Sequence, residues 1–171
     1  MSSGMSAFTV FHVVISLIGI VAGLVVLFGM ISGKRLDPWT GLFLLTTVAT
    51  SVTGFFFPFR GVTPGIVVGI LSLIVLAVAI VGRYRRHLAG GWRKTYVITS
   101  VIALYFNVFV LIVQLFEKVS ALHALAPNGS EPPFLIVQVI VMIVFGALGI
   151  AAVKGFRDQS PMLRGQSARA A

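Results

Sequence analysis

Cysteine is absent from the 171 residues, and charge is scarce, since charged residues make up 10% of the chain. Without cysteine the chain has no disulfide framework, no thiolate metal site and no thiol nucleophile. A soluble domain carries roughly 25% charged residues, so this chain has too few of them to cover a water-facing surface. The composition excludes an ordinary soluble enzyme, a disordered regulator and a nucleic-acid-binding domain.

Long apolar runs take the place of the missing charge. Hydrophobic residues make up 58% of the chain, and the mean hydropathy is +1.06. Residues 1–33 carry no charge, and four further charge-free windows of 22 residues each follow at 38–59, 61–82, 95–116 and 132–153. A helix of that length is about 33 Å long, close to the ~30 Å hydrocarbon core of a bilayer.

The windows predict an all-α fold, an integral membrane bundle of five transmembrane helices. Residues 1–156 form its single domain, and residues 157–171 form a disordered basic tail. We expect the first segment to be retained, because it lacks preceding basic residues and is longer than a signal-peptide core. The expected spans lie near 8–31, 39–59, 64–83, 95–117 and 133–153.

Helix ends have their own sequence signals. Asp37, Thr63 and Glu131 each precede a proline, and a polar cap before proline is typical of a helix start. Gly33 suits the end of the first helix.

The net charge of +9 is distributed unevenly between the two sides of the predicted bundle. Eleven Lys and Arg residues fall on one side, whereas Arg60 and Lys118 fall on the other. Basic residues favour the cytoplasmic side, so we expect an outer N-terminus and a cytoplasmic C-terminus. The eleven are Lys34, Arg35, Arg83, Arg85, Arg86, Arg93, Lys94, Lys154, Arg157, Arg164 and Arg169.

Small residues predict where helices approach each other closely. Gly19 and Gly23 form a GxxxG pair in the first expected helix, and Gly65 and Gly69 form another in the third. Such pairs let helix backbones pack tightly in lipid, within one chain or between copies.

Polar side chains of different segments converge at the expected outer side. Asn107, Gln114 and Lys118 share one stripe of the fourth helix, and Gln138 lies at a depth where it can pair with Gln114. Arg60, Glu117 and Glu131 fall nearby. We hypothesise an outward-facing polar pocket, the alternative being a solvated rim. Its predicted ligand-binding residues are His12, Asn107, Gln114, Lys118, His123 and Gln138.

Two further polar features have local interpretations. The second helix is rich in hydroxyls, which in lipid can bond their own helix backbone, and it runs into the aromatic segment 55–59. Asn128–Gly129–Ser130 matches a glycosylation acceptor, but Asn-Gly is a common turn, and we interpret it as one.

Motifs of known chemistry are missing. The chain has no phosphate-binding glycine loop, no HExxH and no GxSxG, and no carboxylate lies deep in a span. We predict no catalytic residue, no metal site and no cofactor. A haem or quinone held through His12 and His123 remains an alternative.

Four segments carry a resemblance: FHVVISLIGIVAGLVVLFG, TTVATSVTGFFFPF, LHALAP and SEPPFLIVQ. In these the chain resembles uncharacterised small multi-span inner-membrane proteins of proteobacteria. The resemblance implies a bacterial inner membrane and brings no activity.

The leading functional hypothesis is a non-enzymatic accessory or binding protein of the membrane. Its pocket takes a lipid-like or small amphiphilic ligand, or its surface packs against a membrane protein partner. The alternatives are a small oligomeric transporter and a redox subunit binding quinone or haem. The expected partners are the lipid bilayer and a second copy or another membrane protein, and no nucleic acid.

Overall fold

The computed structural model describes residues 7–58, 61 and 63–156, and these residues form helices and turns without a strand. The long helices are α1 (Ala7–Ile31), α2 (Asp37–Gly54), α3 (Pro64–Ile80), α4 (Trp92–Lys118) and α6 (Pro132–Gly155). A π-helical turn, Val81–Arg85, prolongs α3, and a single turn, α5 (Ser120–His123), follows α4. The all-α prediction is confirmed.

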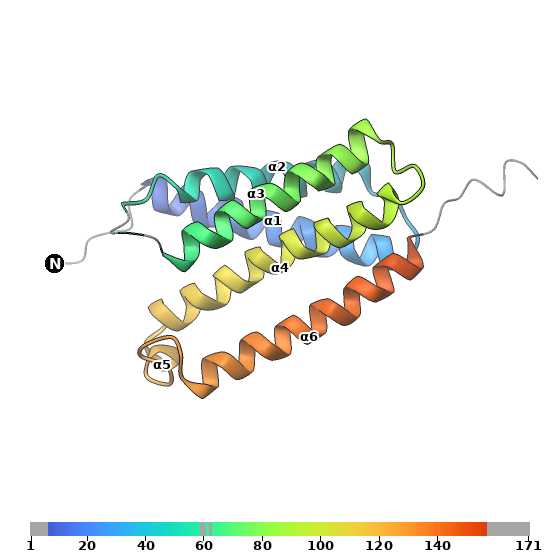
Figure 1. Cartoon of the computed structure of the whole chain (residues 1–171). Helices are drawn as coiled ribbons and strands as arrows, with labels where there is room; N and C mark the ends of the chain where they lie inside the picture. The colour runs from blue at the N-terminus through green and yellow to red at the C-terminus, as the bar shows by residue number, and fades with distance from the viewer. Residues whose placement is uncertain (1–6, 59–60, 62, 157–171) are drawn as a thin grey trace, which may run out of the picture.

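The first four long helices form a ring. Each of α1, α2 and α3 packs against the next helix, and α4 closes the ring by packing against α1. Helix α6 lies outside the ring, in contact with α4 and α1 (Figure 1). Short connections make neighbours along the chain antiparallel, so α1 begins and α6 ends at opposite ends of the bundle.

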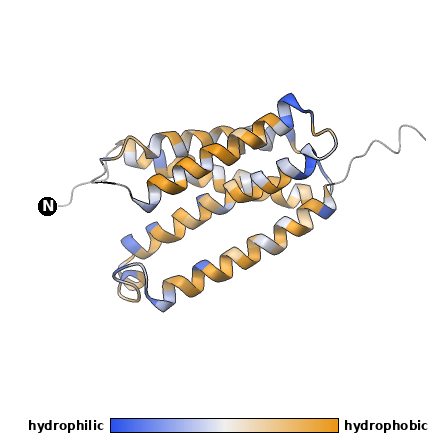
Figure 2. Cartoon of the chain, in the orientation of Figure 1, coloured by the Kyte–Doolittle hydropathy of each residue, from blue (hydrophilic) through white to orange (hydrophobic). Residues whose placement is uncertain are grey.

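Four helical segments are long and apolar enough to cross a membrane: α1, Pro64–Arg85, α4 and α6. Hydrophobic residues run along their length, while hydrophilic ones gather near the two ends of the bundle (Figure 2). Helix α2 has enough length at 18 residues, but Asp37 and several hydroxyls make it less apolar than the other four.

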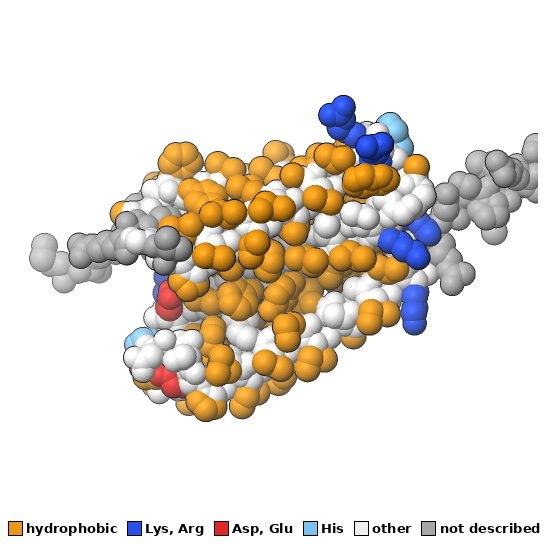
Figure 3. Space-filling view, viewed as in Figure 1, with side chains coloured by type: hydrophobic (Ala, Val, Ile, Leu, Met, Phe, Trp, Pro, Cys, Tyr) orange, Lys and Arg blue, Asp and Glu red, His pale blue; other side chains and the backbone are white. Residues whose placement is uncertain are grey.

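Basic side chains cluster at the end of the bundle where α6 ends, whereas acidic side chains are visible at the other end (Figure 3). We call these the basic end and the mouth end. Lys34, Arg35, Arg85, Arg86 and Lys94 are exposed at the basic end. Arg60 and the predicted tail 157–171 lie outside the described residues.

Two predicted helix bounds are wrong. Helix α2 ends at Gly54 rather than near residue 59, because Pro58 disfavours helical geometry before it and residues 55–57 turn instead. Helix α3 continues beyond residue 83 through its π-helical turn, closed by the Arg86 N–H donating to the Val81 carbonyl over 2.9 Å. Arg83 therefore belongs to a helix and not to a solvated loop.

The expected caps have different outcomes. Thr63 is confirmed as the cap of α3, because its Oγ1 accepts the Ile66 N–H at 3.4 Å. Gly33 is confirmed at the end of α1, where its φ of +71° favours glycine. Asp37 is no cap, since Leu36 takes that position. Glu131 stands at the cap of α6, but its carboxylate accepts hydrogen bonds from the preceding loop.

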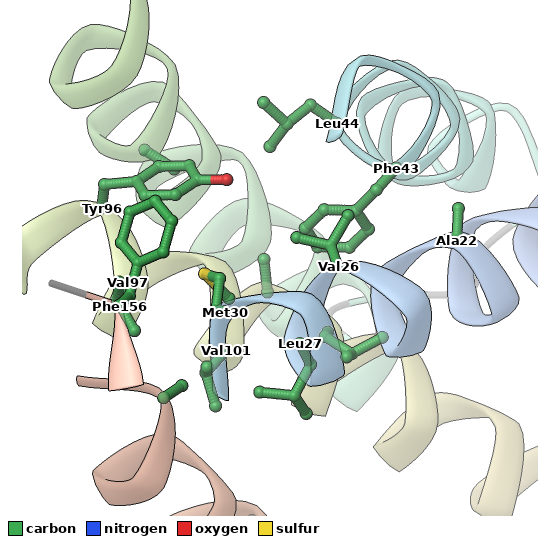
Figure 4. Close-up of a cluster of buried hydrophobic side chains, with 14 of the residues drawn as sticks. Ala22, Val26, Leu27, Met30, Phe43, Leu44, Tyr96, Val97, Val101 and Phe156 are labelled. Carbon is green, nitrogen blue, oxygen red and sulfur yellow. The ribbon is translucent and has the colours of Figure 1, made fainter. Parts of the chain in front are cut away.

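A dense apolar core fills the ring toward the basic end (Figure 4). It joins Leu27 of α1, Phe43 of α2 and Leu104 of α4, all about 1% exposed, with Tyr96 of α4, which is fully buried. Lipid tails are as apolar as these side chains, so van der Waals packing, rather than escape from water, supplies the stabilisation.

Candidate functional site

A cavity of about 520 Å³ opens inside the ring, in the half toward the mouth end. The first turns of α1 and α3 and the last turns of α2 and α4 surround it. Its wall is mainly apolar, with a small number of polar groups. The polar or charged side chains in the wall are Thr9, His12, Ser16, Thr50, Ser51, Ser72, Asn107, Gln114 and Lys118.

His12 is held in place by the end of α2. Its Nδ1 lies 2.8 Å from Thr53 Oγ1, and its ring meets the Phe57 ring edge-on at 5.0 Å between centroids. Thr53 Oγ1 donates its single proton to the Ala49 carbonyl over 2.7 Å, so it accepts from His12. In the neutral imidazole the proton is then on Nδ1, and Nε2 is left as an acceptor.

The hydroxyls of α2 divide into satisfied and unsatisfied groups. Thr46 donates to the Leu42 carbonyl over 2.7 Å, and Ser51 donates to the Thr47 carbonyl over 2.9 Å. Thr50 Oγ1 is buried without a hydrogen-bond partner among the described residues. Thr50 lines the cavity, but its Oγ1 is itself buried, so the unpaired hydroxyl is a cost to the fold and not an exposed binding group.

Asn107 forms the deep end of the polar wall on α4. It is 8% exposed, and its Nδ2 donates to Thr47 Oγ1 over 3.3 Å. Within the described part of the chain, no donor contacts its carbonyl oxygen. An amide in hydrocarbon needs such partners, so the carbonyl can accept a hydrogen bond from a ligand.

The mouth of the cavity lies at the end of α4. Gln114 Nε2 donates to Glu117 Oε2 over 3.2 Å, and Lys118 is exposed. The structure thus brings His12, Asn107, Gln114 and Lys118 to one cavity. Their role in ligand binding stays a prediction.

The other two predicted site residues lie elsewhere. His123 is exposed on α5 and does not line the cavity. Gln138 is buried on α6, which packs outside the ring, and its Nε2 donates to the Phe109 carbonyl over 3.3 Å. The expected pairing of Gln114 with Gln138 is wrong. The Gln114 amide donates to Glu117 within α4, whereas the Gln138 amide donates to the Phe109 carbonyl.

The predicted packing glycines differ in what surrounds them. A Cβ added at Gly19 would lie 3.0 Å from Thr46 Oγ1, and one at Gly23 would lie 2.6 Å from Leu104 Cδ1. A Cβ at Gly69 would lie 3.0 Å from the Phe55 ring, whereas one at Gly65 would meet only Thr63. Gly19 and Gly23 therefore face the inside of the ring, where a second copy cannot reach them.

Arg83, counted from the sequence among the basic residues of the expected cytoplasmic side, is a buried charge. It is 5% exposed, forms an ion pair with Asp37 and donates to the Tyr96 hydroxyl over 3.3 Å. Its guanidinium also lies 5.3 Å from the Tyr96 ring centroid, a favourable cation–π distance. The signal for it was Asp37, an acidic residue set among basic loops.

The fold and the cavity define a class: a helical membrane protein with a mainly apolar cavity, carrying a few polar groups, inside its helix ring. No family model, curated protein or solved structure matches the chain.

Proposed function

We propose that this chain is a non-enzymatic binding protein of the bacterial inner membrane, and that its cavity holds a lipid-like or small amphiphilic ligand. The observation that carries the proposal is the cavity inside the ring. Its 520 Å³ falls within the ~300–1,000 Å³ of small-molecule sites, which are mostly apolar with a few placed polar groups. His12, Asn107 and Gln114 are among the few polar side chains in its wall.

Five spans and a cytoplasmic basic end complete the proposal. Helix α2 lies in the ring between α1 and α3, so a membrane crossed by its neighbours also surrounds α2. The basic cluster favours the cytoplasmic side, which places the mouth end outside. A cysteine replacing Leu125 should react with a membrane-impermeant thiol reagent in intact cells, and one replacing Ala89 should not. Both positions are exposed, and the reverse pattern would invert the orientation.

The apolar core favours binding over transport. Phe43, Leu104 and Tyr96 fill the ring toward the basic end, so no cavity-lining residue lies in that part of the ring and a path through the whole bundle is blocked. The redox alternative loses support because His12 and His123 do not meet in one cavity.

A cavity-filling variant tests the binding role. Ser16→Phe puts a ring into the cavity, whereas Val14→Phe, on the same helix, adds one at a position 48% exposed outside. We expect native mass spectrometry of protein in mild detergent to show a co-purified ligand in wild type and Val14→Phe and its loss in Ser16→Phe. Circular dichroism should show equal helix content in all three. Equal ligand occupancy in both variants would contradict the proposal.

A further inference from the structure

The charge of the cavity wall has one sign. Among the described residues that line it there is no Asp or Glu, and Lys118 is the one side chain with a permanent charge. His12, the other titratable residue of the wall, is neutral or positive. An anion entering the cavity meets no carboxylate on its wall.

Lys118 has no counterion within the described part of the chain. Both ion pairs found there belong to Asp37 at the basic end. The neighbouring carboxylate of Glu117 accepts from Gln114 instead. The Lys118 ammonium is therefore free to bind a ligand, although its place in the last turn of α4 also suits the helix dipole.

An apolar path leads inward from Lys118. Leu115 and Leu111 follow it along the cavity-facing side of α4, and Asn107 lies at the deep end. The eleven steps along the helix from Lys118 to Asn107 correspond to about 16 Å. Phe106 and Val110 of the same helix and Val68 of α3 add apolar wall. A cation at the mouth and an apolar interior match an anionic head on an apolar tail.

We infer that the cavity selects single-chain amphiphiles with an anionic head group, and that Lys118 binds this head at the mouth while the tail lies along α4. The inference rests on the proposed function and adds the charge of the ligand. A hydrogen bond between an ammonium and an anion is stronger than one between neutral groups. A carboxylate or phosphate head should therefore bind better than an alcohol on the same tail.

Three probes of equal chain length test the inference: dodecanoate, dodecyl phosphate and dodecanol. The full-length protein in non-ionic detergent at pH 8 is titrated with each, and bound molecules are counted by native mass spectrometry. We expect at least one anion to bind roughly tenfold more tightly than dodecanol. A preference for dodecanoate indicates a free fatty acid as the natural source, and a preference for dodecyl phosphate indicates a phospholipid head group.

Two lysine variants locate the effect. Lys118→Gln should remove the preference for anions and leave dodecanol binding unchanged. Lys94→Gln is the matched control, because Lys94 is exposed at the basic end, away from the cavity, and it should behave as wild type. A preference that survives in Lys118→Gln would overturn the role of Lys118.

The remaining outcomes separate the two proposals. Equal wild-type affinities for all three probes would overturn the inference about charge while leaving the cavity a binding site for amphiphiles. Failure of all three probes to bind would overturn the proposed function, and the inference with it.

Discussion

The two halves of the helix ring differ in how charged side chains are bonded and in how closely the helices pack. At the basic end Arg83 is paired with Asp37 and bonded to Tyr96, and Arg93 donates to the Phe156 carbonyl over 2.6 Å. In the other half of the ring, Thr50 Oγ1 and the Asn107 carbonyl have no partner in the described part of the chain.

Helix packing follows the same contrast. Close to the basic end, Gly155 of α6 lies directly against the backbone of Ile31, the last residue of α1. In the mouth half, the ring encloses a cavity instead of side chains. Ser100 Oγ in the basic half of α4 is buried without a described partner, as Thr50 Oγ1 is, so the two halves differ in how they bond charged side chains and in packing. The basic end bonds Arg83 and Arg93 within the protein, whereas the mouth half leaves space for another molecule. The basic end thus stabilises the bundle, whereas the mouth end is the one proposed to bind a ligand.

The largest loss of stability is expected when a side chain is added at Gly155, where α6 contacts α1 at the basic end. A Cβ at Gly155 would overlap the Ile31 backbone, which cannot rotate away as a side chain can. Gly155→Ala should cost about 3 kcal/mol of unfolding free energy, measured by SDS titration in mixed micelles. Gly146→Ala on the same helix meets nothing within 4 Å and should be neutral or ~0.5–1 kcal/mol more stable. Equal curves for the two variants would contradict the close packing.

Removing the partner of the buried arginine should have the next largest effect. Asp37→Asn leaves the Arg83 charge buried, but the Asp37 side chain is 63% exposed. We therefore expect a loss of about 2 kcal/mol, between the ~1 of an exposed pair and the ~3–5 of a fully buried one. Glu117→Gln at the mouth end is the matched control and should change stability by less than ~0.5 kcal/mol. Similar losses in both variants would remove the distinction between the two ends.

Two threonines of α2 test the unsatisfied groups beside the cavity. Thr47→Val removes the acceptor of Asn107 Nδ2 and should destabilise the fold by about 1 kcal/mol. Thr50→Val removes a hydroxyl without a described partner and should be neutral or up to ~1 kcal/mol more stable. Thermal unfolding of ligand-free protein in detergent measures both. The reverse order would show that Thr50 is the satisfied residue.

The smallest effect is expected in the exposed loop at the mouth end. Desolvation alone raises the pKa of Glu131. Hydrogen bonds from the backbone N–H groups of Asn128, Ser130 and Glu131 itself, and from the Asn128 amide, outweigh it and lower the pKa to about 2 from its usual 4.5. The stabilisation is therefore present above pH 4.5 and is lost as the pH falls toward 2.

An acid titration measures this loop. The wild-type unfolding temperature should fall further between pH 4.5 and 2 than that of Glu131→Gln, and the two proteins should respond alike to pH above 5. A parallel decline of both proteins down to pH 2 would contradict the role of Glu131 in the loop.

The loop also shows what local sequence predicts well. The turn at Asn128–Gly129 is confirmed, with a φ of +66° at Gly129, and so are the Thr63 cap and the Gly33 helix end. Each depends on residues within a few positions of one another, where backbone conformation follows from residue type. The expected helix α2 exists, but its predicted end near residue 59 is wrong. Errors of this kind arise at the ends of helices, where a turn competes with the last helical residues.

The site was predictable only along single helices. Asn107, Gln114 and Lys118 share one side of α4, as helical periodicity requires, and all three line the cavity. Gln138 was expected at the depth of Gln114, but it does not line the cavity, because its helix α6 packs outside the ring. Thr50 carried no sequence signal to distinguish it from Thr46 and Thr53, since all three could donate to their own helix backbone and only Thr46 and Thr53 do.

The sequence by itself determined that the chain forms apolar helices, where most of them begin and end, and that basic residues gather at one end. These properties are local, set by composition and helical periodicity. Only the tertiary structure decided that Arg83 lies inside the bundle with Asp37, that α6 stays outside the ring, and that the mouth half encloses a cavity. Those outcomes depend on how helices distant in sequence pack, because a buried charge in an apolar layer needs a partner that a neighbouring helix brings to it.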